Sequence, residues 1–181
     1  KSLTQSTMID KLGAQYEVPV HTTPVGFKFL GPVMLREEAL AAGEESGGYA
    51  FRGNIPERDG IFSGLLFLEL MVRTGKRPSE LVQWLFEQVG PHYYDRWDLE
   101  LDPGKAATTQ SLLESPAPER LGGLRVTGQG TEDGVRYLLE DGYWGLVRFS
   151  GTEPLVRIYA EAESDEEVEW LLEETRDIAG V

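Results

Sequence analysis

Residues 155–179 read LVRIYAEAESDEEVEWLLEETRDIA, a strand-like run that passes directly into a helix-like run. Alternate positions in the first part are apolar, which is typical of a strand with one buried face: Val156, Ile158, Ala160 and Ala162. The second part opens on Ser164 and Glu167, which have the spacing of a helix capping box. Side chains suited to a buried face then recur at helical spacing, at Val168, Leu171, Leu172, Thr175, Ile178 and Ala179. We therefore predict a strand followed by an amphipathic helix that packs on one face of a sheet.

Three further strand-like runs precede this stretch, at residues 124–127, 135–140 and 144–149. Asp141-Gly142 separates the last two, and this dipeptide is a strong signal for a β-hairpin. Residues 121–181 thus predict a small α+β domain, with a four-stranded, largely antiparallel sheet and a C-terminal helix.

The first ninety residues alternate helical patterns with short extended runs, which favours an α/β fold. We expect helices from Met8, over residues 27–41, after an Asp59 N-cap, and from Pro78 to Val89, and a strand over residues 16–20. The two apolar helices after Asp59 are expected to lie in the core. Between residues 91 and 120 prolines and glycines interrupt the pattern, which predicts an interdomain connection.

Composition narrows the classes of partner. The chain has 181 residues, is 40% apolar and has a net charge of −14, which permits folded cores and disfavours binding to duplex DNA or to anionic membranes. Residues 161–181 contain nine acidic residues and one basic residue. We interpret this segment as a solvated helix face, with an acidic docking surface as the alternative.

The chain has no cysteine and two histidines. Disulfides, thiolate catalysis and Cys-based metal sites are therefore excluded, and a site of several histidines is disfavoured. No run approaches 18 apolar residues, and the polar first residues do not form the apolar segment of a signal peptide. A cytoplasmic location is the default expectation.

The loop Arg148-Phe149-Ser150-Gly151-Thr152-Glu153-Pro154 follows one strand-like run and precedes another. Its guanidinium can donate two bonds to a phosphate, its hydroxyls can donate more, and successive backbone N–H groups can form an anion nest. The alternative is a hairpin turn whose hydroxyls cap its own backbone while Arg148 pairs with a nearby acid.

A second loop reads Gly43-Glu44-Glu45-Ser46-Gly47-Gly48. Carboxylates beside a hydroxyl suit a ligand with several hydroxyl groups, such as a sugar. A solvated acidic turn is the alternative. Glu44 and Glu45 are less suited to act as an acid and base pair, because neighbouring side chains need not face one cavity.

Taken together and in this order, the two loops resemble those of the α-D-phosphohexomutase superfamily, the phosphoglucomutases and phosphomannomutases. In that family a Gly-Glu-x-Ser-Gly loop of the third domain binds sugar hydroxyls, and an Arg-x-Ser-Gly-Thr-Glu-Pro loop of the fourth holds the substrate phosphate. The resemblance covers only the C-terminal part of such enzymes. It implies that residues 1–90 are the end of the third domain and residues 121–181 the fourth.

The resemblance assigns roles residue by residue. Sugar contacts would come from Glu44 and Ser46, and from the backbone near Gly26 in a segment, residues 23–28, similar to the family's specificity loop. Arg58 resembles a basic residue that faces the substrate, although pairing with Glu57 or Asp59 is an alternative. The phosphate cradle would comprise Arg148, Ser150, Gly151 and Thr152, while weaker candidates are Lys28, Glu45 and Arg157.

The family's catalytic phosphoserine loop and its Mg²⁺ loop have no counterpart in this sequence. The resemblance therefore implies no catalytic or metal residue in this chain, which alone would be inactive. The whole enzyme would use Mg²⁺ to interconvert hexose 1-phosphate and hexose 6-phosphate through a hexose 1,6-bisphosphate intermediate. Partners would be the hexose phosphate and the missing N-terminal domains of the same enzyme.

Several alternatives remain open. The loops look more like those of phosphoglucomutases than of phosphoglucosamine mutases, but a phosphomannomutase or a dual-specificity mutase fits too. A noncatalytic phosphosugar-binding module and a protein-interaction domain that uses the acidic helix are the rivals from other classes. If the third-domain sheet lacks strands, its edge would favour self-association.

Overall fold

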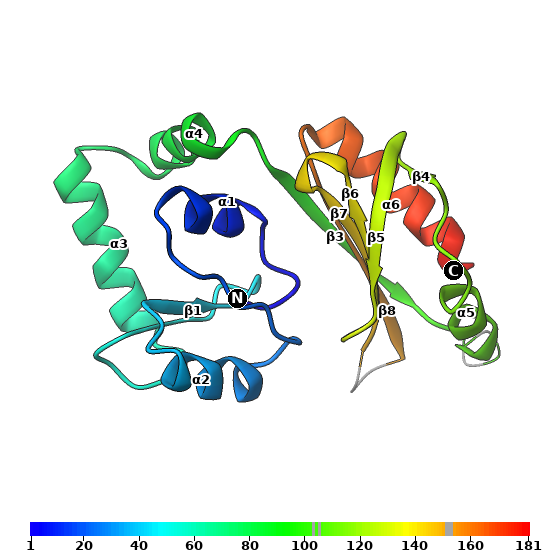
Figure 1. Cartoon of the computed structure of the whole chain (residues 1–181), viewed down its shortest axis with the longest axis horizontal. Helices are drawn as coiled ribbons and strands as arrows, with labels where there is room; N and C mark the ends of the chain where they lie inside the picture. Colours follow the sequence, from blue (N-terminus) through cyan, green and yellow to red (C-terminus); the bar gives the residue numbers. More distant parts are fainter. Residues whose placement is uncertain (103, 105, 151–153) are drawn as a thin grey trace. The chain divides into compact units, whose positions relative to one another are not determined.

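The structure, a computed structural model, describes residues 1–102, 104, 106–150 and 154–181. The chain divides into two compact units, Lys1–Gly90 and Pro91–Val181, here called unit 1 and unit 2 (Figure 1). Each unit has its own buried cluster of apolar side chains, so each is described by itself.

Unit 1 is mostly helical. Its elements are α1 (Met8–Gln15), α2 (Phe27–Arg36), β1 (Ala41–Gly43), β2 (Tyr49–Phe51), α3 (Gly60–Thr74) and α4 (Pro78–Val89). Strands β1 and β2 form a two-stranded antiparallel sheet. Residues 1–3 lie between Thr23 and Gly43, because Ser2 N donates to Gly43 O and Leu3 N donates to Thr23 O.

In unit 1, two predicted helix starts are confirmed, and one predicted strand and one predicted helix end are wrong. Asp59 caps α3 as predicted, since its carboxylate accepts a hydrogen bond from Phe62 N at 2.8 Å, and α4 begins at Pro78. Residues 16–20, all of them described, do not form the expected strand. The predicted helix over residues 27–41 is also too long: it ends at Arg36, Glu38 takes a left-handed φ of 49°, and Ala41 pairs in β1 instead.

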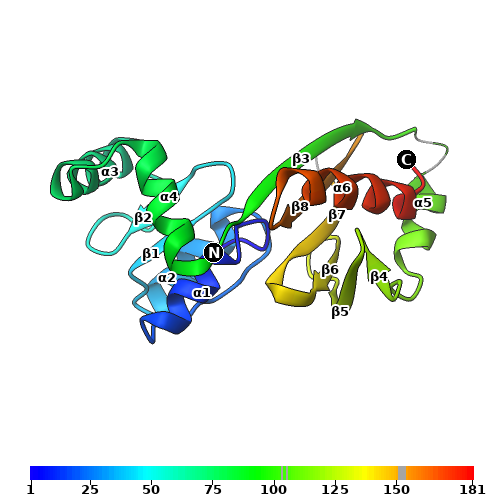
Figure 2. The same cartoon turned by 90° about the horizontal axis from the view of Figure 1, so that it is seen from above.

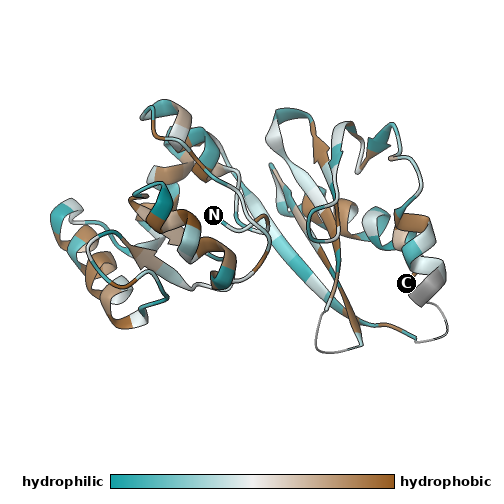
Figure 3. Ribbon diagram, turned by 60° about the horizontal axis from the view of Figure 1, so that its bottom comes forward, coloured by the Kyte–Doolittle hydropathy of each residue, from teal (hydrophilic) through white to brown (hydrophobic). Residues whose placement is uncertain are grey.

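The core of unit 1 is small, and the prediction that α3 and α4 are buried is wrong. The core cluster comprises Phe27, Leu30, Met34, Ala42 and Ala50. No residue of α3 is buried, and α4 buries only Leu81. A helix that is apolar on most sides normally lies inside a protein, so its composition predicted burial without identifying what would cover it. Figure 3 shows the brown, apolar ribbon along the helices of this unit.

Unit 2 is a six-stranded antiparallel sheet with helices. Its strand order is β3-β8-β7-β6-β5-β4, and every neighbouring pair is antiparallel. Figures 1 and 2 show α6 along one face of this sheet. Its elements are β3 (Tyr93–Glu100), α5 (Ala106–Leu113), β4 (Arg120–Leu121), β5 (Leu124–Gly130), β6 (Val135–Leu139), the 3₁₀ turn η1 (Glu140–Gly142), β7 (Trp144–Phe149), β8 (Leu155–Ala162) and α6 (Asp165–Ala179).

The antiparallel sheet and the C-terminal helix agree with the sequence analysis, but the predicted number of four strands is wrong. The two additional strands lie at the edges, and both begin in the segment assigned to a connection. Strand β3 was not predicted from the sequence, because most of its side chains are exposed and several are charged, so the alternation of apolar residues is weak. Strand β4 has only two residues. Residues 91–120 thus contribute β3, α5 and the start of β4 to unit 2.

The predicted hairpin between β6 and β7 is confirmed. Asp141 and Gly142 have φ values of 62° and 86°, and Leu139 N donates to Tyr143 O at 2.8 Å. A left-handed backbone at these positions is what an Asp-Gly turn supplies at low cost. The turn therefore places the antiparallel register of β6 and β7.

Helix α6 covers the main core. Its buried side chains Val168, Leu171, Leu172, Thr175 and Ala179 pack towards the sheet, as the spacing predicted. Ser164 Oγ accepts from Glu167 N at 3.2 Å, but Glu167 Oε2 accepts from Glu163 N rather than from Ser164 N. Only half of the predicted capping box is formed.

None of the helices in the described parts of the chain has the length and apolar character needed to cross a bilayer.

Candidate functional site

The two motifs singled out from the sequence lie at two strand connections, one in each unit. The first connects β1 to β2 as a tight hairpin. Glu44 N donates to Gly48 O at 2.9 Å, and Gly47 N donates to Glu44 O at 3.0 Å. Gly47 has a φ of 90°, which side chains disfavour. The Glu44 side chain is nearly buried, with 6% exposed, whereas Ser46 is exposed at the tip of the hairpin.

Arg58 lies against this hairpin. Its Nη1 atom is 3.5 Å from Glu44 Oε2, and its Nε atom is 3.0 Å from Glu57 Oε1. A Cβ added at Gly48 would lie 2.5 Å from Arg58 Cδ, so glycine allows the arginine to pack on the turn. The alternative interpretation of Arg58, pairing with Glu57, is observed, and Arg58 also contacts the candidate sugar-binding carboxylate of Glu44.

Gly26 is linked to Arg58 through the next residue in the chain, Phe27. It is the N-cap of α2 with a φ of 125°, and the ring centre of Phe27 lies 5.4 Å from the Arg58 guanidinium carbon. Phe27, Glu44 and Arg58, distant in sequence, are therefore in mutual contact through the Arg58 guanidinium. The weaker candidate Lys28 is exposed, with Nζ placed 4.9 Å from the ring centre of its neighbour Phe29.

Arg58 favours the ionised form of its neighbour Glu57. The pKa of Glu57 is lowered because its carboxylate accepts a hydrogen bond from the backbone N–H of Arg58 and a second from the guanidinium. A buried carboxylate beside a guanidinium, with a hydroxyl at the hairpin tip, is a set of donors and acceptors that suits the hydroxyl groups of a polar ligand.

The second loop lies between β7 and β8 in unit 2. Its base is closed by a hydrogen bond from Ser150 N to Leu155 O at 2.8 Å. Arg148 lies near the end of β7, just before the loop, and Ser150 is half-buried. Gly151 and Thr152, the other two predicted phosphate contacts, lie outside the described residues.

Arg157, a weaker candidate in the sequence analysis, is the register partner of Arg148. Arg148 on β7 lies directly opposite Arg157 on β8 in the antiparallel register, so both side chains leave the same face of the sheet. The geometry of the closed loop fixes which residues of β7 and β8 face each other. The sequence does not give that geometry, so the pairing of Arg148 with Arg157 could not be predicted from it.

Each of these two arginines has an aspartate beside it. Arg148 Nε is 3.0 Å from Asp133 Oδ1, and Arg157 Nε is 3.6 Å from Asp98 Oδ2. The alternative reading, in which Arg148 pairs with an acid, is therefore observed. Two guanidiniums side by side present two positive charges and planar sets of donors, which suit a dianion.

A metal site is not among the arrangements that the described residues offer. Within residues 1–102, 104, 106–150 and 154–181, no three His, Asp or Glu side chains gather in a way that could hold an ion.

Comparison with known proteins connects both units to one family. The family description "Phosphoglucomutase/phosphomannomutase, alpha/beta/alpha domain III" matches residues 1–89. The description "Phosphoglucomutase/phosphomannomutase, C-terminal domain" matches residues 103–178. The two matches follow each other in the chain order that these descriptions imply.

Individual relatives agree with these matches. A phosphoglucomutase/phosphomannomutase of Thermococcus kodakarensis is 30% identical over 173 residues, covering 95% of this chain and 35% of that protein. A phosphoglucosamine/phosphogalactosamine mutase of Sulfurisphaera tokodaii is 29% identical, covering 98% and 37%. A crystal structure from Thermus thermophilus, described as a candidate phosphomannomutase, is similar with a TM-score of 0.79 and 36% identity, covering 99% and 36%. This chain thus spans little more than a third of the length of these proteins.

Proposed function

Because this chain belongs to the phosphoglucomutase/phosphomannomutase superfamily, we propose that it is the substrate-binding C-terminal part of a phosphohexomutase. The whole enzyme would interconvert hexose 1-phosphate and hexose 6-phosphate through a hexose 1,6-bisphosphate intermediate. The observation that carries the proposal is the adjacent pair of Arg148 and Arg157 on one sheet face, at the two ends of the loop that resembles the family's phosphate loop.

In this proposal unit 2 holds the phosphate that does not react. Arg148 and Arg157 donate charge-assisted hydrogen bonds to its oxygens, and Ser150, Gly151 and Thr152 supply hydroxyl and backbone donors. A dianion is well matched to two guanidiniums, because each contributes one positive charge and a planar set of donors.

Unit 1 would hold the sugar. Glu44 accepts hydrogen bonds from sugar hydroxyls, Ser46 accepts and donates, and the backbone near Gly26 lies against the ring. Arg58, which contacts Glu44, holds that carboxylate and contributes positive charge towards the substrate. The exposed Arg58 side chain packs against Gly48 and Phe27.

The proposed contacts with groups that do not react give a physical reason why one site can serve both phosphoryl transfers. The sugar must turn over between two phosphoryl transfers, and both orientations place a phosphate and hydroxyls in similar positions. Interactions with these groups convert binding energy into positioning of the reacting oxygen. Phosphoryl transfer itself needs a donor group and Mg²⁺. The described residues do not form an Mg²⁺ site, so we assign that chemistry to the rest of the enzyme.

The proposal for the preferred hexose is based on the sequences of the two loops. Gly26-Phe27-Lys28 and Glu44-Glu45-Ser46-Gly47-Gly48 are more similar to phosphoglucomutases, so glucose phosphates are the first candidates. Mannose phosphates are the alternative, because epimers differ in one hydroxyl orientation and discrimination depends on which polar group stays unpaired. We expect such an enzyme to work in the cytoplasm.

The proposal is tested by titrating the chain with glucose 1-phosphate and glucose 6-phosphate, followed by NMR or calorimetry. We expect both isomers to bind, and Arg148→Ala and Arg157→Ala to weaken binding at least about tenfold, since each removes charge-assisted bonds. Arg125→Ala is the matched control, because Arg125 pairs with Glu140 on another part of the same sheet. Equal affinities of the wild type and both site variants would contradict the phosphate site.

A noncatalytic phosphosugar-binding module is the second candidate, since the adjacent Arg148 and Arg157 could bind a phosphate without taking part in a reaction. One observation distinguishes the two candidate functions, the reading frame upstream of this segment. A reading frame that continues upstream through both loops supports the mutase, whereas a frame that starts at this segment supports the binding module.

A further inference from the structure

Gly48 immediately precedes β2 and lies one residue after the Gly-Glu-x-Ser-Gly pattern of residues 43–47. Its φ lies outside the left-handed region, unlike the φ of 90° at Gly47. Because alanine can adopt such a backbone, the turn itself does not require glycine at position 48. What a side chain at this position would meet therefore decides whether the glycine matters.

The stem of Arg58 occupies the space in which a side chain at position 48 would begin. A Cβ atom built on Gly48 would lie 2.5 Å from Arg58 Cδ and 2.9 Å from Arg58 Cγ. Contacts below 3.0 Å are essentially never seen for a Cβ atom, so one of the two groups would have to move. The same Cβ atom would lie 3.6 Å from Glu44 Oε2, which is an ordinary contact. A methyl group at position 48 would thus displace Arg58 and leave room for Glu44.

The backbone next to Arg58 is held beside the hairpin by hydrogen bonds. Asp59 N donates to Tyr49 O at 3.0 Å, which joins the residue after Arg58 to the residue after Gly48. The Asp59 carboxylate accepts from Phe62 N at 2.8 Å at the start of α3. The Arg58 side chain therefore leaves the backbone at a defined point along the hairpin.

Three further contacts place the Arg58 guanidinium. Its Nε atom donates a hydrogen bond to Glu57 Oε1 at 3.0 Å, and the same oxygen accepts from the Arg58 backbone N–H at 2.8 Å. Its carbon Cζ lies 5.4 Å from the ring centre of Phe27, a buried residue of the core of unit 1. Its Nη1 atom lies 3.5 Å from Glu44 Oε2. The ring, the two carboxylates and the glycine thus surround the arginine from different sides.

Glu44 and Arg58 differ in exposure. The Glu44 side chain is 6% exposed and that of Arg58 is 55% exposed, so the guanidinium lies beside a nearly buried carboxylate and is still open to a ligand. Opposite charges interact more strongly when one of them is withdrawn from water. The position of Arg58 therefore sets the electrostatic surroundings of the candidate sugar-binding carboxylate.

We propose that Gly48 is a positioning residue for sugar recognition: its lack of a side chain admits the stem of Arg58 and so holds the guanidinium beside Glu44, where both groups meet hydroxyls of the substrate. Glu57 is a second positioning residue, because its carboxylate holds Nε of the arginine. This inference rests on the proposed function and goes beyond it, since the family resemblance gives no role to Gly48 or Glu57. Neither residue would touch the sugar.

The proposal predicts that one added methyl group acts on sugar binding only through Arg58. Gly48→Ala should weaken the binding of glucose 6-phosphate about tenfold, close to the loss caused by Arg58→Ala. In the double variant Gly48→Ala/Arg58→Ala, the loss should equal that of Arg58→Ala alone, because substitutions that remove the same contact are not additive.

The role of Glu57 predicts an effect opposite to that of charge alone. Removing an acid near an anionic ligand should tighten binding if only charge matters. If Glu57 positions Arg58, Glu57→Ala weakens the binding of glucose 6-phosphate instead. Glu57→Gln keeps an oxygen that accepts from Nε, so it should restore most of the affinity.

The experiment measures dissociation constants of the full 181-residue chain for glucose 6-phosphate and for inorganic phosphate by calorimetry. Inorganic phosphate lacks the sugar, so its affinity should be the same for the wild type and Gly48→Ala. Gly64→Ala is the matched control, because it adds the same methyl group within α3, where nothing lies within 4 Å of the added atom. NMR of the Arg58 Nε–H group is the second readout: its signal should shift in Gly48→Ala and Glu57→Ala and stay in place in Gly64→Ala.

The outcomes separate this inference from the function on which it rests. A Gly48→Ala chain that binds glucose 6-phosphate as tightly as the wild type overturns the positioning role, while Arg148→Ala still tests the phosphate site. A double variant weaker than Arg58→Ala overturns it as well, since the methyl group would then act on the hairpin directly. If Gly48→Ala does not fold, equal affinities of Glu57→Ala and the wild type overturn it. A wild-type chain that binds no hexose phosphate overturns the proposed function and this inference together.

Discussion

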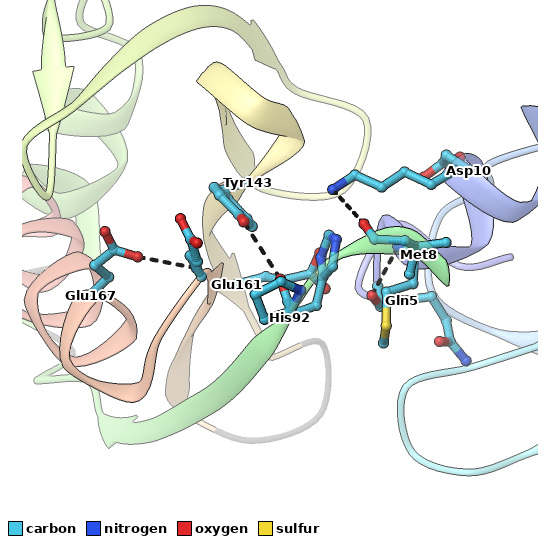
Figure 4. Close-up of polar contacts among 12 residues, drawn as sticks. Gln5, Met8, Asp10, His92, Tyr143, Glu161 and Glu167 are labelled. Atoms are coloured by element: carbon cyan, nitrogen blue, oxygen red, sulfur yellow. Dashed lines mark hydrogen bonds and ion pairs between the residues drawn. The ribbon is translucent and has the colours of Figure 1, made fainter. Parts of the chain in front are cut away.

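At the scale of single residues, a buried pair of ionisable groups is a notable feature of unit 2. His92 Nδ1 lies 2.8 Å from Glu161 Oε1, and both side chains are fully buried (Figure 4). The Tyr143 ring lies 5.4 Å from the His92 ring. Burial, followed by the nearby acids Glu163 and Glu167, raises the pKa of Tyr143 to about 12, so its hydroxyl stays neutral near pH 7. The pair joins the start of β3 to the end of β8.

Breaking this pair should cost more stability than removing it whole. We expect His92→Ala to lower the free energy of unfolding of unit 2 by about 3–5 kcal/mol, because it leaves a buried carboxylate without its partner. The double variant His92→Leu/Glu161→Leu replaces both groups with apolar ones and should stay close to the wild type. Urea denaturation followed by tryptophan fluorescence measures both. A single variant as stable as the double variant would show that the pair carries no such penalty.

At the scale of elements, α6 is the helix whose start and buried face were both readable from the sequence. Ser164 accepts a hydrogen bond from Glu167 N, which otherwise has no partner within the helix. Ser164→Ala should therefore lower the free energy of unfolding by about 1 kcal/mol, whereas Ser164→Asp keeps the cap and should not. Thermal or urea unfolding compares the two. Equal losses for both substitutions would mean that packing near Ser164, rather than the cap, is responsible.

Elements whose partners are distant were harder to predict. Helix α3 has a strong N-cap at Asp59, which the sequence revealed, but its burial depended on what packs against it. Strand β3 pairs along its whole length with β8, from Tyr93 opposite Ala162 to Glu100 opposite Leu155. Its edge position keeps most side chains exposed, so the strand lacks the apolar alternation by which the inner strands were found.

At the scale of the whole molecule, α3 carries an apolar stripe that the described residues leave in solvent. Ile61, Leu65, Leu68 and Val72 recur at helical spacing and are 83%, 59%, 54% and 75% exposed. An exposed stripe of this kind is unusual for a monomeric protein. Burial of each such side chain contributes roughly 1.5–3 kcal/mol.

We therefore expect the isolated chain to self-associate through this stripe. Its average mass in sedimentation equilibrium should rise with concentration, and Ile61→Gln/Val72→Gln should keep it monomeric without changing its charge. Leu138→Gln, a substitution at an exposed apolar residue of unit 2, is the control. Association that persists in the double variant would point to a strand edge such as that of the two-stranded sheet in unit 1.

Several features that depend only on neighbours along the chain were determined by the sequence alone. The cap of α6, the Asp141-Gly142 turn and the two family motifs each involve a few consecutive residues, whose hydrogen bonds and backbone angles are local. The tertiary structure decided the rest: the exposure of α3, the position of β3 at a sheet edge, and the pairing of Arg148 with Asp133 and of Arg157 with Asp98. Strand register and burial are set by partners far away in sequence, so no local pattern contains them.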